Sequence, residues 1–234
     1  MYFDWTYLVL VLPFVLLSMW ASSNVNNTFQ KYAKQYSSRG ITGAQAAQRV
    51  LMMHGVRGVS ITQVSGNLTD HFDPKSNVIR LSEGVYNSTS TAAIGVACHE
   101  AGHAVQYSVG YFPMKIRARI IPVTNFGSKL AMPLILAGVL LSAFGYYLYD
   151  LVYIGIAWFS LSLVFQLVTL PVEFNASRRA MQAIENSDIL TDEEQNGARK
   201  TLSAAAMTYV AALAVAVMQL LRLLIIVGNS RRRR

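Results

Sequence analysis

Residues 130–172 read LAMPLILAGVLLSAFGYYLYDLVYIGIAWFSLSLVFQLVTLPV, and this stretch decides the class of fold. Its only charged residue is Asp150. One transmembrane helix needs about 20 consecutive apolar residues, and the run is about twice that length. We therefore expect a transmembrane hairpin at 130–172, with its two helices joined by a turn near Tyr149–Leu151.

Two more apolar blocks lie on either side of this hairpin. The sequence WTYLVLVLPFVLLSMWAS at Trp5–Ser22 is about long enough to cross a bilayer, and it predicts an N-terminal anchor within residues 1–22. The block Leu202–Gly228 is rich in alanine, which lets membrane helices pack closely, and a basic tail follows at 229–234. The chain is thus predicted to be a mainly α, polytopic membrane protein with about four transmembrane helices.

The composition agrees with a membrane protein and argues against a soluble domain and a nucleic-acid-binding protein. Hydrophobic residues make up 53% of the chain and charged residues only 14%, which is too apolar for an ordinary soluble domain. The net charge of +8 comes from Lys and Arg that flank the apolar blocks, whereas a nucleic-acid-binding protein carries them in a basic patch. We expect the lipid bilayer as a partner, and no nucleic acid. The single cysteine, Cys98, excludes an intrachain disulfide.

The polar segment 23–129 is predicted to form a small α+β domain with a short β-sheet. A helix is expected from Thr42, its N-cap, to Gly55, which suits the position after a helix end. Strands are expected at Val59–Val64 and Val78–Leu81, each between turn residues. An amphipathic helix leaving the membrane is predicted from the helical spacing of Val25, Phe29, Tyr32 and Tyr36.

One motif in this domain carries chemistry. Residues Thr91–Tyr107 predict a helix, and within it His99, Glu100 and His103 form the pattern HExxH. Residues four apart share one face of a helix, so both imidazoles can bind a common Zn²⁺ while Glu100 reaches a water beside it. The pattern is typical of metalloproteases in which the glutamate is the catalytic general base.

Zinc at a catalytic site takes three protein ligands, so one more residue is needed. The candidates are the other two histidines and the acidic residues outside the motif: His54, His71, Glu173, Glu185, Asp188, Asp192, Glu193 and Glu194. Glu173 stands out because it follows the hairpin and opens a polar helix and loop at 173–201, outside the hydrocarbon. Two membrane crossings would return it to the side that carries the histidines.

Four stretches resemble the YugP-type neutral zinc metallopeptidases of bacterial membranes. They are LTDHFDP (68–74), LSEGVYNS (81–88), HEAGHAVQ (99–106) and LPVEFNASRRA (170–180). The resemblance implies a gluzincin site, with His99, His103 and Glu173 on zinc. It also implies a membrane-embedded zinc-dependent endopeptidase that cleaves peptides or membrane proteins by metal-activated water.

A more distant similarity concerns the residues after the third ligand. Residues 173–177, EFNAS, resemble the E-x-x-A-D motif of HtpX-like and CAAX-prenyl-protease-like enzymes, in which the Asp supports a ligand histidine. Ser177 takes the Asp position here and is itself a candidate to support a ligand histidine or to bind substrate. The alternative is that a backbone carbonyl or another acid orients the imidazole. In gluzincins a strand beside the active helix pairs with the substrate, and the strand containing Val78, Ile79 and Arg80 is the candidate.

Further residues have a chemical and a simpler interpretation. His71 could stabilise an oxyanion, although turn bonding by Asp70 and Asp73 explains its segment without any chemistry. Arg178 and its neighbour Arg179 could bind a substrate carboxylate, although basic residues beside a membrane usually set orientation or contact lipid headgroups.

The distribution of basic residues favours a cytoplasmic site in a multi-pass cell-membrane protein. The loops Ser23–Lys129 and Pro171–Thr201 hold 15 of the 20 Lys and Arg, and positive residues prefer the inside. The tail Arg231–Arg234 argues the other way, since four spans would place it outside. A re-entrant last block or an inverted orientation are the alternatives.

A rival function is a catalytically silent membrane scaffold or regulator, with or without bound metal. Glu100 favours the enzyme, because it is not itself a ligand and a scaffold would not need it. A transporter is disfavoured, because its spans would be expected to carry ionisable residues within the membrane.

Overall fold

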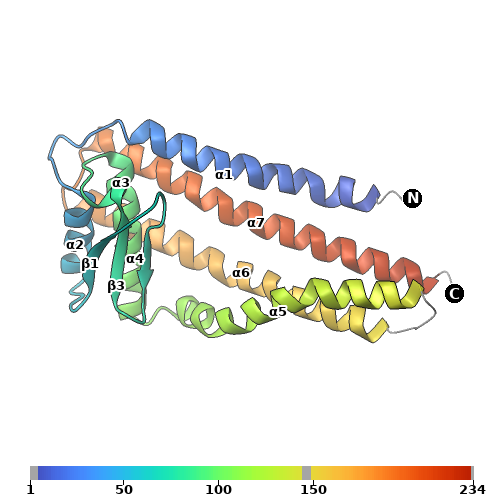
Figure 1. Ribbon diagram of the computed structural model, residues 1–234. Coiled ribbons are helices and arrows are strands. Elements are labelled where there is room, and N and C mark those ends of the chain that lie inside the picture. Colours follow the sequence, from blue (N-terminus) through green and yellow to red (C-terminus); the bar gives the residue numbers. More distant parts are fainter. Residues whose placement is uncertain (1–4, 144–148, 233–234) are drawn as a thin grey trace. The chain divides into compact units, whose positions relative to one another are not determined.

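The structure is a computed structural model that describes residues 5–143 and 149–232. A short π-helical turn, η1 (Tyr7–Val11), leads into the first α-helix (Figure 1). The α-helices are α1 (Leu12–Tyr32), α2 (Gly43–Met53), α3 (Glu83–Tyr86), α4 (Thr91–Ser108), α5 (Phe112–Ala143), α6 (Tyr149–Asn186) and α7 (Asp192–Arg232). The strands are β1 (Ser60–Val64), β2 (His71–Asp73) and β3 (Val78–Ser82).

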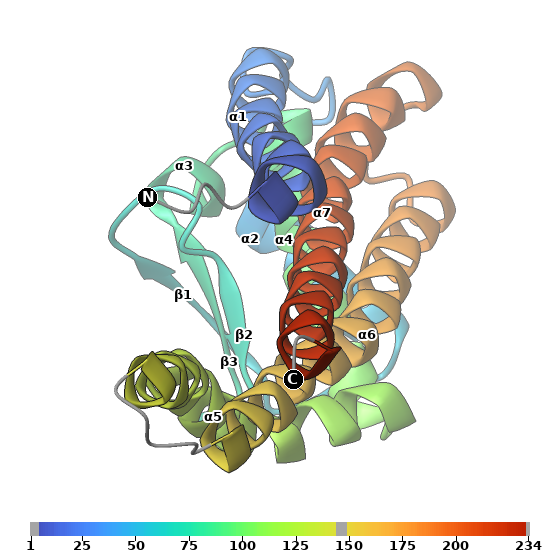
Figure 2. The same cartoon turned by 90° about the vertical axis from the view of Figure 1, so that its right-hand side faces the viewer.

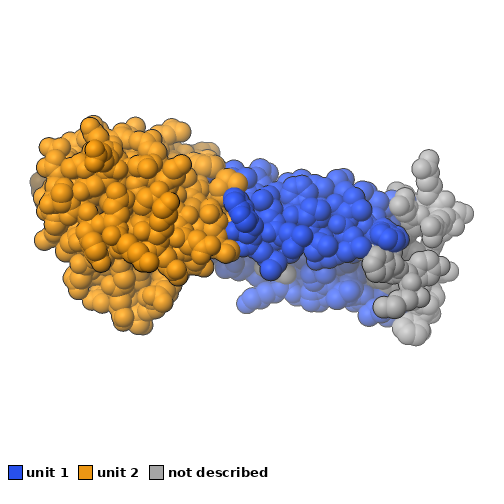
Figure 3. All heavy atoms as spheres, turned by 90° about the horizontal axis from the view of Figure 1, so that it is seen from above, with its two compact units in different colours: residues 1–20, 116–170, 209–234 blue, residues 21–115, 171–208 orange. Residues whose placement is uncertain are grey.

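Within the described residues, four helices are long and apolar enough to cross a membrane, as the sequence predicts. These segments are Tyr7–Tyr32, Phe112–Gly138, Asp150–Asn186 and Asp192–Gly228. The chain divides into two compact units, coloured separately in Figure 3. Unit 1 comprises residues 1–20, 116–170 and 209–234, and unit 2 comprises residues 21–115 and 171–208.

Unit 1 holds the apolar parts of the long helices. Helices α5 and α6 approach closely at Gly155, where a Cβ atom would lie 2.9 Å from the backbone oxygen of Ala131. Small residues allow such contacts between membrane helices. The guanidinium of Arg222 on α7 lies over the ring of Tyr7, with 5.4 Å between Cζ and the ring centroid. This contact covers a charge within an apolar span.

Unit 2 is built on α2 and α4, which pack around one apolar core. Thr42 caps α2 with a complete capping box, since its side chain accepts from Gln45 N and the Gln45 side chain accepts from Thr42 N. After the helix, Gly55 adopts a φ of +64°, which a glycine tolerates at no steric cost. The predicted helix Thr42–Gly55 is confirmed. The core includes Cys98, which is fully buried and unpaired.

The sheet of unit 2 has three strands in the order β1-β3-β2 (Figure 2). Strand β1 is parallel to β3, and β2 is antiparallel to it. Both predicted strands are confirmed. The third strand, β2, falls in the segment that the sequence assigns to turns, because three residues are too short to show an alternating pattern.

One predicted boundary of the hairpin differs from the structure. The first arm of the hairpin begins at Phe112 and not at Leu130, because Lys and Arg near a helix start do not interrupt it. The turn predicted near Tyr149–Leu151 adjoins residues 144–148, which lie outside the described part; residues 149–151 themselves open α6. Asp150 lies in the first helical turn, where a carboxylate favours the helix dipole.

The predicted amphipathic helix after the anchor is not a separate element. Helix α1 continues to Tyr32, and Phe29 packs against the core of unit 2. Tyr36 lies beyond the helix, is 67% exposed, and forms an isolated β-bridge with Ser90. The helical spacing of the apolar residues therefore predicted a helix as far as Tyr36, although the helix ends at Tyr32.

Candidate metal centre

Helix α4 presents both motif histidines on one face. Its N-cap is Ser90, whose side chain accepts a hydrogen bond from Ala93 N, and the helix matches the predicted Thr91–Tyr107 within one residue. The rings of His99 and His103 lie edge to face, with centroids 4.7 Å apart and an angle of 85° between their planes. This one-turn spacing leaves both rings able to reach a common atom.

A close backbone contact brings α6 to this face of α4. A Cβ atom built on Gly102 would lie 2.7 Å from the backbone oxygen of Ala176, so no larger residue fits there without moving α6. Gly102 is the fourth residue of the HExxH pattern, and Ala176 lies three residues after Glu173. The glycine thus permits the approach that brings Glu173 to the histidines.

Glu173 meets both imidazoles through the same carboxylate oxygen. Its Oε2 lies 3.3 Å from His99 Nε2 and 3.5 Å from His103 Nε2. The three residues form a group that could hold a metal ion, with all ligand atoms within 4.8 Å of one another. The expected meeting of Glu173 with the two histidines, despite the hairpin between them in sequence, is present in the structure.

The two distances from Glu173 Oε2 to the imidazole nitrogens fit a zinc ion. Zinc lies about 2.0–2.2 Å from nitrogen and oxygen ligands, and tetrahedral geometry then separates neighbouring ligand atoms by roughly 3.3–3.6 Å. The two nitrogen–oxygen distances, 3.3 and 3.5 Å, fall in this interval. Two neutral imidazoles and one carboxylate also suit the preference of zinc for nitrogen and oxygen ligands.

The site is buried, and its carboxylates change the pKa of His103. His103 is 8% exposed, Glu100 8% and Glu173 3%. Burial disfavours the charged form of His103, yet its hydrogen bond with Glu173 and the negative charges of Glu100 and Glu173 outweigh burial and raise its pKa. Without a metal, the site therefore attracts a positive charge between the carboxylates and the imidazoles.

Ser177 contacts the other nitrogen of His99. Its Oγ lies 3.1 Å from His99 Nδ1, so the serine itself occupies the supporting position. This contact favours Ser177 over a backbone carbonyl or another acid as the residue that orients the imidazole. The cause is geometric: Ser177 lies one helical turn beyond Glu173, and both side chains reach His99 from α6.

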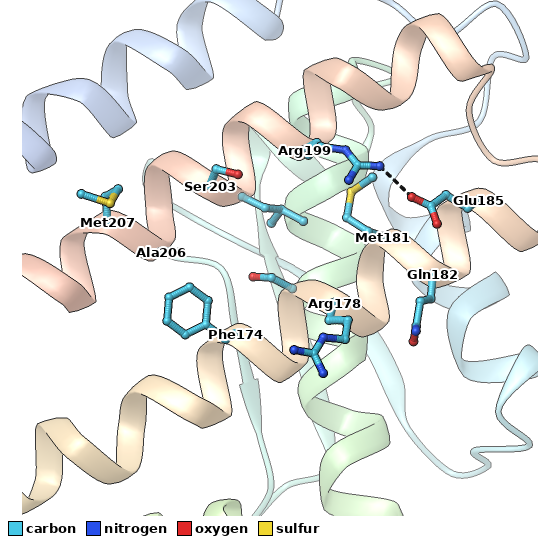
Figure 4. A pocket seen from close by; sticks show the side chains of 11 residues that line it. Phe174, Arg178, Met181, Gln182, Glu185, Arg199, Ser203, Ala206 and Met207 are labelled. Atoms are coloured by element: carbon cyan, nitrogen blue, oxygen red, sulfur yellow. Dashed lines mark hydrogen bonds and ion pairs between the residues drawn. The ribbon is translucent and has the colours of Figure 1, made fainter.

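A groove of about 580 Å³ between α6 and α7 reaches the site through Ser177. Phe174 and Met207 lie at one end, and the ion pair between Arg199 and Glu185 lies at the other, with 2.8 Å between Arg199 Nη2 and Glu185 Oε1 (Figure 4). Ser177, which contacts His99 Nδ1, lines this groove, whereas His99, His103 and Glu173 do not.

Other residues singled out in the sequence are engaged elsewhere. His71 is exposed on β2, and its Nδ1 lies 2.8 Å from Thr69 O. Arg80 bonds Asp73 Oδ2 at 3.1 Å. Arg178 is exposed and lines the groove. None of these three contributes a ligand atom to the triad.

The strand expected to pair with substrate is paired on both sides along residues 78–80. Strand β3 is central: Val78, Ile79 and Arg80 pair with β1 on one side and with β2 on the other. Both rows of backbone groups along these residues are used within the sheet. The interpretation of this strand as the substrate-pairing strand is therefore wrong, because alternation and sequence position do not distinguish a central strand from an edge strand.

The sequence did not predict the contacts of two polar residues near the site, Gln106 and Asp70. Gln106 is fully buried, and its Oε1 lies 3.0 Å from His103 Nδ1. Gln106 comes three residues after His103, on the same helix face, and this spacing could have indicated the contact. Asp70 accepts hydrogen bonds from Ser82 N (2.7 Å) and Ser82 Oγ, which hold it beside the end of β3. Burial raises the pKa of Asp70, and the charge of Glu100 adds to that shift. Asp73 does form the expected turn, through Lys75 N.

Comparisons with known proteins agree with this geometry. The family described as "Putative neutral zinc metallopeptidase" matches residues 7–228. The protein "Putative membrane protease YugP" of Bacillus subtilis (strain 168) is 47% identical over 215 residues, which cover 92% of this chain and 93% of that protein. No solved structure matches the chain.

Proposed function

The chain belongs to the neutral zinc metallopeptidase family, and from this premise we propose that it is a membrane-embedded, zinc-dependent endopeptidase. His99, His103 and Glu173 hold the zinc in this proposal, and Glu100 is the general base. The substrates are peptides or membrane proteins.

One observation carries the proposal. Glu173 Oε2 lies at tetrahedral ligand spacing from two Nε2 atoms, although Glu173 and the histidines are on different helices. An accidental HExxH on a helix surface would have no reason to meet a buried carboxylate from a distant segment. The contact also supports an enzyme with three protein ligands and one open zinc position.

The residues divide the chemistry between them. Zinc bound by three protein ligands supplies Lewis-acid chemistry, since it polarises a carbonyl and makes water more acidic. Glu100, between the two histidines in sequence, takes the proton from the attacking water and delivers it to the leaving amine. Its carboxylate is close enough to the site for its charge to act on His103. Ser177 and Gln106 hold the outer nitrogens of the two rings.

The experiment separates an enzyme from a silent scaffold. Purified protein in detergent should contain about one zinc per chain by elemental analysis and cleave an unfolded, fluorescently labelled membrane protein. Glu100→Gln should lose about 10²–10⁴-fold in cleavage rate, the typical contribution of a general base, while zinc stays bound. Glu193→Gln, which removes an exposed carboxylate on α7, is the matched control and should cleave normally.

Two results would refute this function. Unchanged cleavage by zinc-bound Glu100→Gln would exclude the glutamate mechanism. Bound zinc without any cleavage by the wild-type protein would favour the scaffold or regulator.

In this proposal the site faces the cytoplasm, because the loops that carry it hold most of the Lys and Arg residues and positive loops prefer the inside. Asn196, exposed in unit 2, provides a position for testing this orientation. A cysteine introduced there by Asn196→Cys should resist a membrane-impermeant thiol reagent in intact cells and react after permeabilisation. Labelling in intact cells would place the site outside.

A further inference from the structure

The side chain of Gln106 connects two of the three candidate zinc ligands. It is fully buried on α4, one turn after His103. Its Oε1 lies 3.0 Å from His103 Nδ1, and its Nε2 lies 2.7 Å from the backbone oxygen of Val172, the residue before Glu173. One amide group thus contacts the ring of one ligand and the backbone beside another.

The directions of these hydrogen bonds follow from chemistry. A backbone carbonyl only accepts, so the Gln106 atom that faces Val172 O must be the amino group, and Oε1 must face His103. Oε1 also only accepts, so His103 Nδ1 must donate and carry the proton. In a neutral imidazole the lone pair then lies on Nε2, the nitrogen that faces Glu173 and the metal position.

A second set of contacts fixes the same orientation from α6. Asn175 Oδ1 accepts from Gln106 Nε2 at 3.0 Å and from Arg179 Nε at 2.9 Å. A guanidinium can only donate, which orients the Asn175 amide and, through it, the Gln106 amide. Val172, Asn175 and Arg179 are three and four residues apart, so they share one face of α6.

The other ligand histidine is held differently. His99 Nδ1 contacts the hydroxyl of Ser177, which can donate or accept and does not by itself select a tautomer. His103 is held by an amide whose two ends are each assigned by a partner of fixed polarity. The network therefore specifies the proton position on His103 more strictly than on His99.

We propose that Gln106 is a positioning residue that sets the tautomer and ring orientation of His103 and links them to the Glu173 segment, with Arg179 and Asn175 as its anchor. This inference rests on the proposed function, because it assumes that His103 binds zinc through Nε2. Gln106 itself touches neither the metal position nor the substrate in this proposal. It acts through the imidazole, as hydrogen-bond partners of metal-bound histidines do.

The test measures zinc affinity and not activity. Gln106→Met keeps the length and approximate volume of the side chain and removes its hydrogen bonds to His103, Val172 and Asn175. Competition with a chromophoric chelator should therefore show a 10- to 100-fold loss of zinc affinity, the range typical for such partners. The visible absorption of the Co²⁺-loaded protein should change as well, because the ring loses its fixed orientation. The control is Val105→Ala, a neighbouring buried position outside the network. It should lower the unfolding temperature without changing zinc affinity.

A second pair of variants keeps the test decisive if Gln106→Met folds poorly. Asn175→Asp preserves an oxygen for both donors and should bind zinc within about threefold of wild type. Asn175→Leu, of similar size, removes that oxygen and should bind zinc more weakly than Asn175→Asp, with an altered Co²⁺ spectrum. Only a positioning role predicts this order, because both variants fill the same space.

The outcomes separate this inference from the proposed function. Absence of zinc in the wild-type protein would refute the function. Zinc bound by wild type, together with unchanged affinity and an unchanged Co²⁺ spectrum in Gln106→Met, would overturn the role of Gln106 and leave the function standing. Equal zinc affinities of Asn175→Asp and Asn175→Leu would overturn the anchoring role of Asn175 and Arg179.

Discussion

Helix α4 and residues 172–179 of α6 build the same site in two different ways. Helix α4 supplies His99, Glu100 and His103 from a single pattern, whose geometry follows from helical periodicity. The α6 segment supplies Glu173, which arrives only after α5 and most of the apolar part of α6. The contribution of α4 is therefore local, whereas that of α6 depends on the topology of the whole chain.

The comparison teaches that a motif locates a site without completing it. The two imidazoles alone leave zinc with too few ligands, and the carboxylate alone would be a buried charge at high cost. Each side depends on the other, because Glu173 Oε2 lies 3.3 Å from His99 Nε2 and 3.5 Å from His103 Nε2, where a shared cation would neutralise the buried carboxylate. Variants on each helix can test this dependence separately.

The largest effect is expected from removing the α6 ligand while α4 stays intact. Structural zinc sites bind with about 10–16 kcal/mol, so one ligand of four accounts for roughly 3–4 kcal/mol, or about 10²–10³-fold in affinity. Glu173→Ala should lose zinc affinity by about this factor, measured by chelator competition. The control is Glu185→Ala, which removes an exposed carboxylate from the same helix. Retention of wild-type affinity in Glu173→Ala would show that the HExxH helix holds the metal without α6.

A smaller effect is expected from widening the distance between the two helices. Gly102→Ala places a methyl group against the backbone oxygen of Ala176, so the helices must separate or shift. Overpacking of this kind typically costs about 1–3 kcal/mol, which should appear as a lower stability in denaturant unfolding and weaker zinc binding. Gly84→Ala is the matched control, because a Cβ there meets no atom within 4 Å. Equal stability and zinc affinity in the two variants would contradict the need for close approach at Gly102.

The smallest effect is expected at the support of His99. Ser177→Ala removes the hydroxyl that contacts Nδ1, and zinc affinity should fall about tenfold, the lower end for such partners. Ser203→Ala is the control, because it removes a hydroxyl from the same groove on α7 (Figure 4). A loss as large as that of Glu173→Ala would mean that Ser177 does more than orient a ring.

The sequence predicted the contribution of α4 to the site more completely than that of α6. The HExxH helix, the capped helix after Thr42 and the strands around residues 60 and 80 follow from patterns of a few residues, and the structure confirms them. Glu173 could be named as a third ligand because two crossings return the chain to its starting side. That argument needed the number of spans and not their exact ends.

What the sequence did not show depends on contacts between distant segments. The partners of Gln106 are Val172 and Asn175, 66 and 69 residues away, and no periodicity connects them. The central place of β3 depends on β2, a strand too short to show a pattern. The start of α5 at Phe112 was missed because its first turns carry charges that an apolar criterion excludes.

Anomalous diffraction at the zinc absorption edge tests the central claim most directly, on crystals of the full chain grown with zinc. The account predicts one strong peak in unit 2, about 2.0–2.2 Å from Nε2 of His99, Nε2 of His103 and a carboxylate oxygen of Glu173. A zinc peak at the two histidines with the Glu173 carboxylate outside coordination distance, or a peak held by other residues, would contradict it.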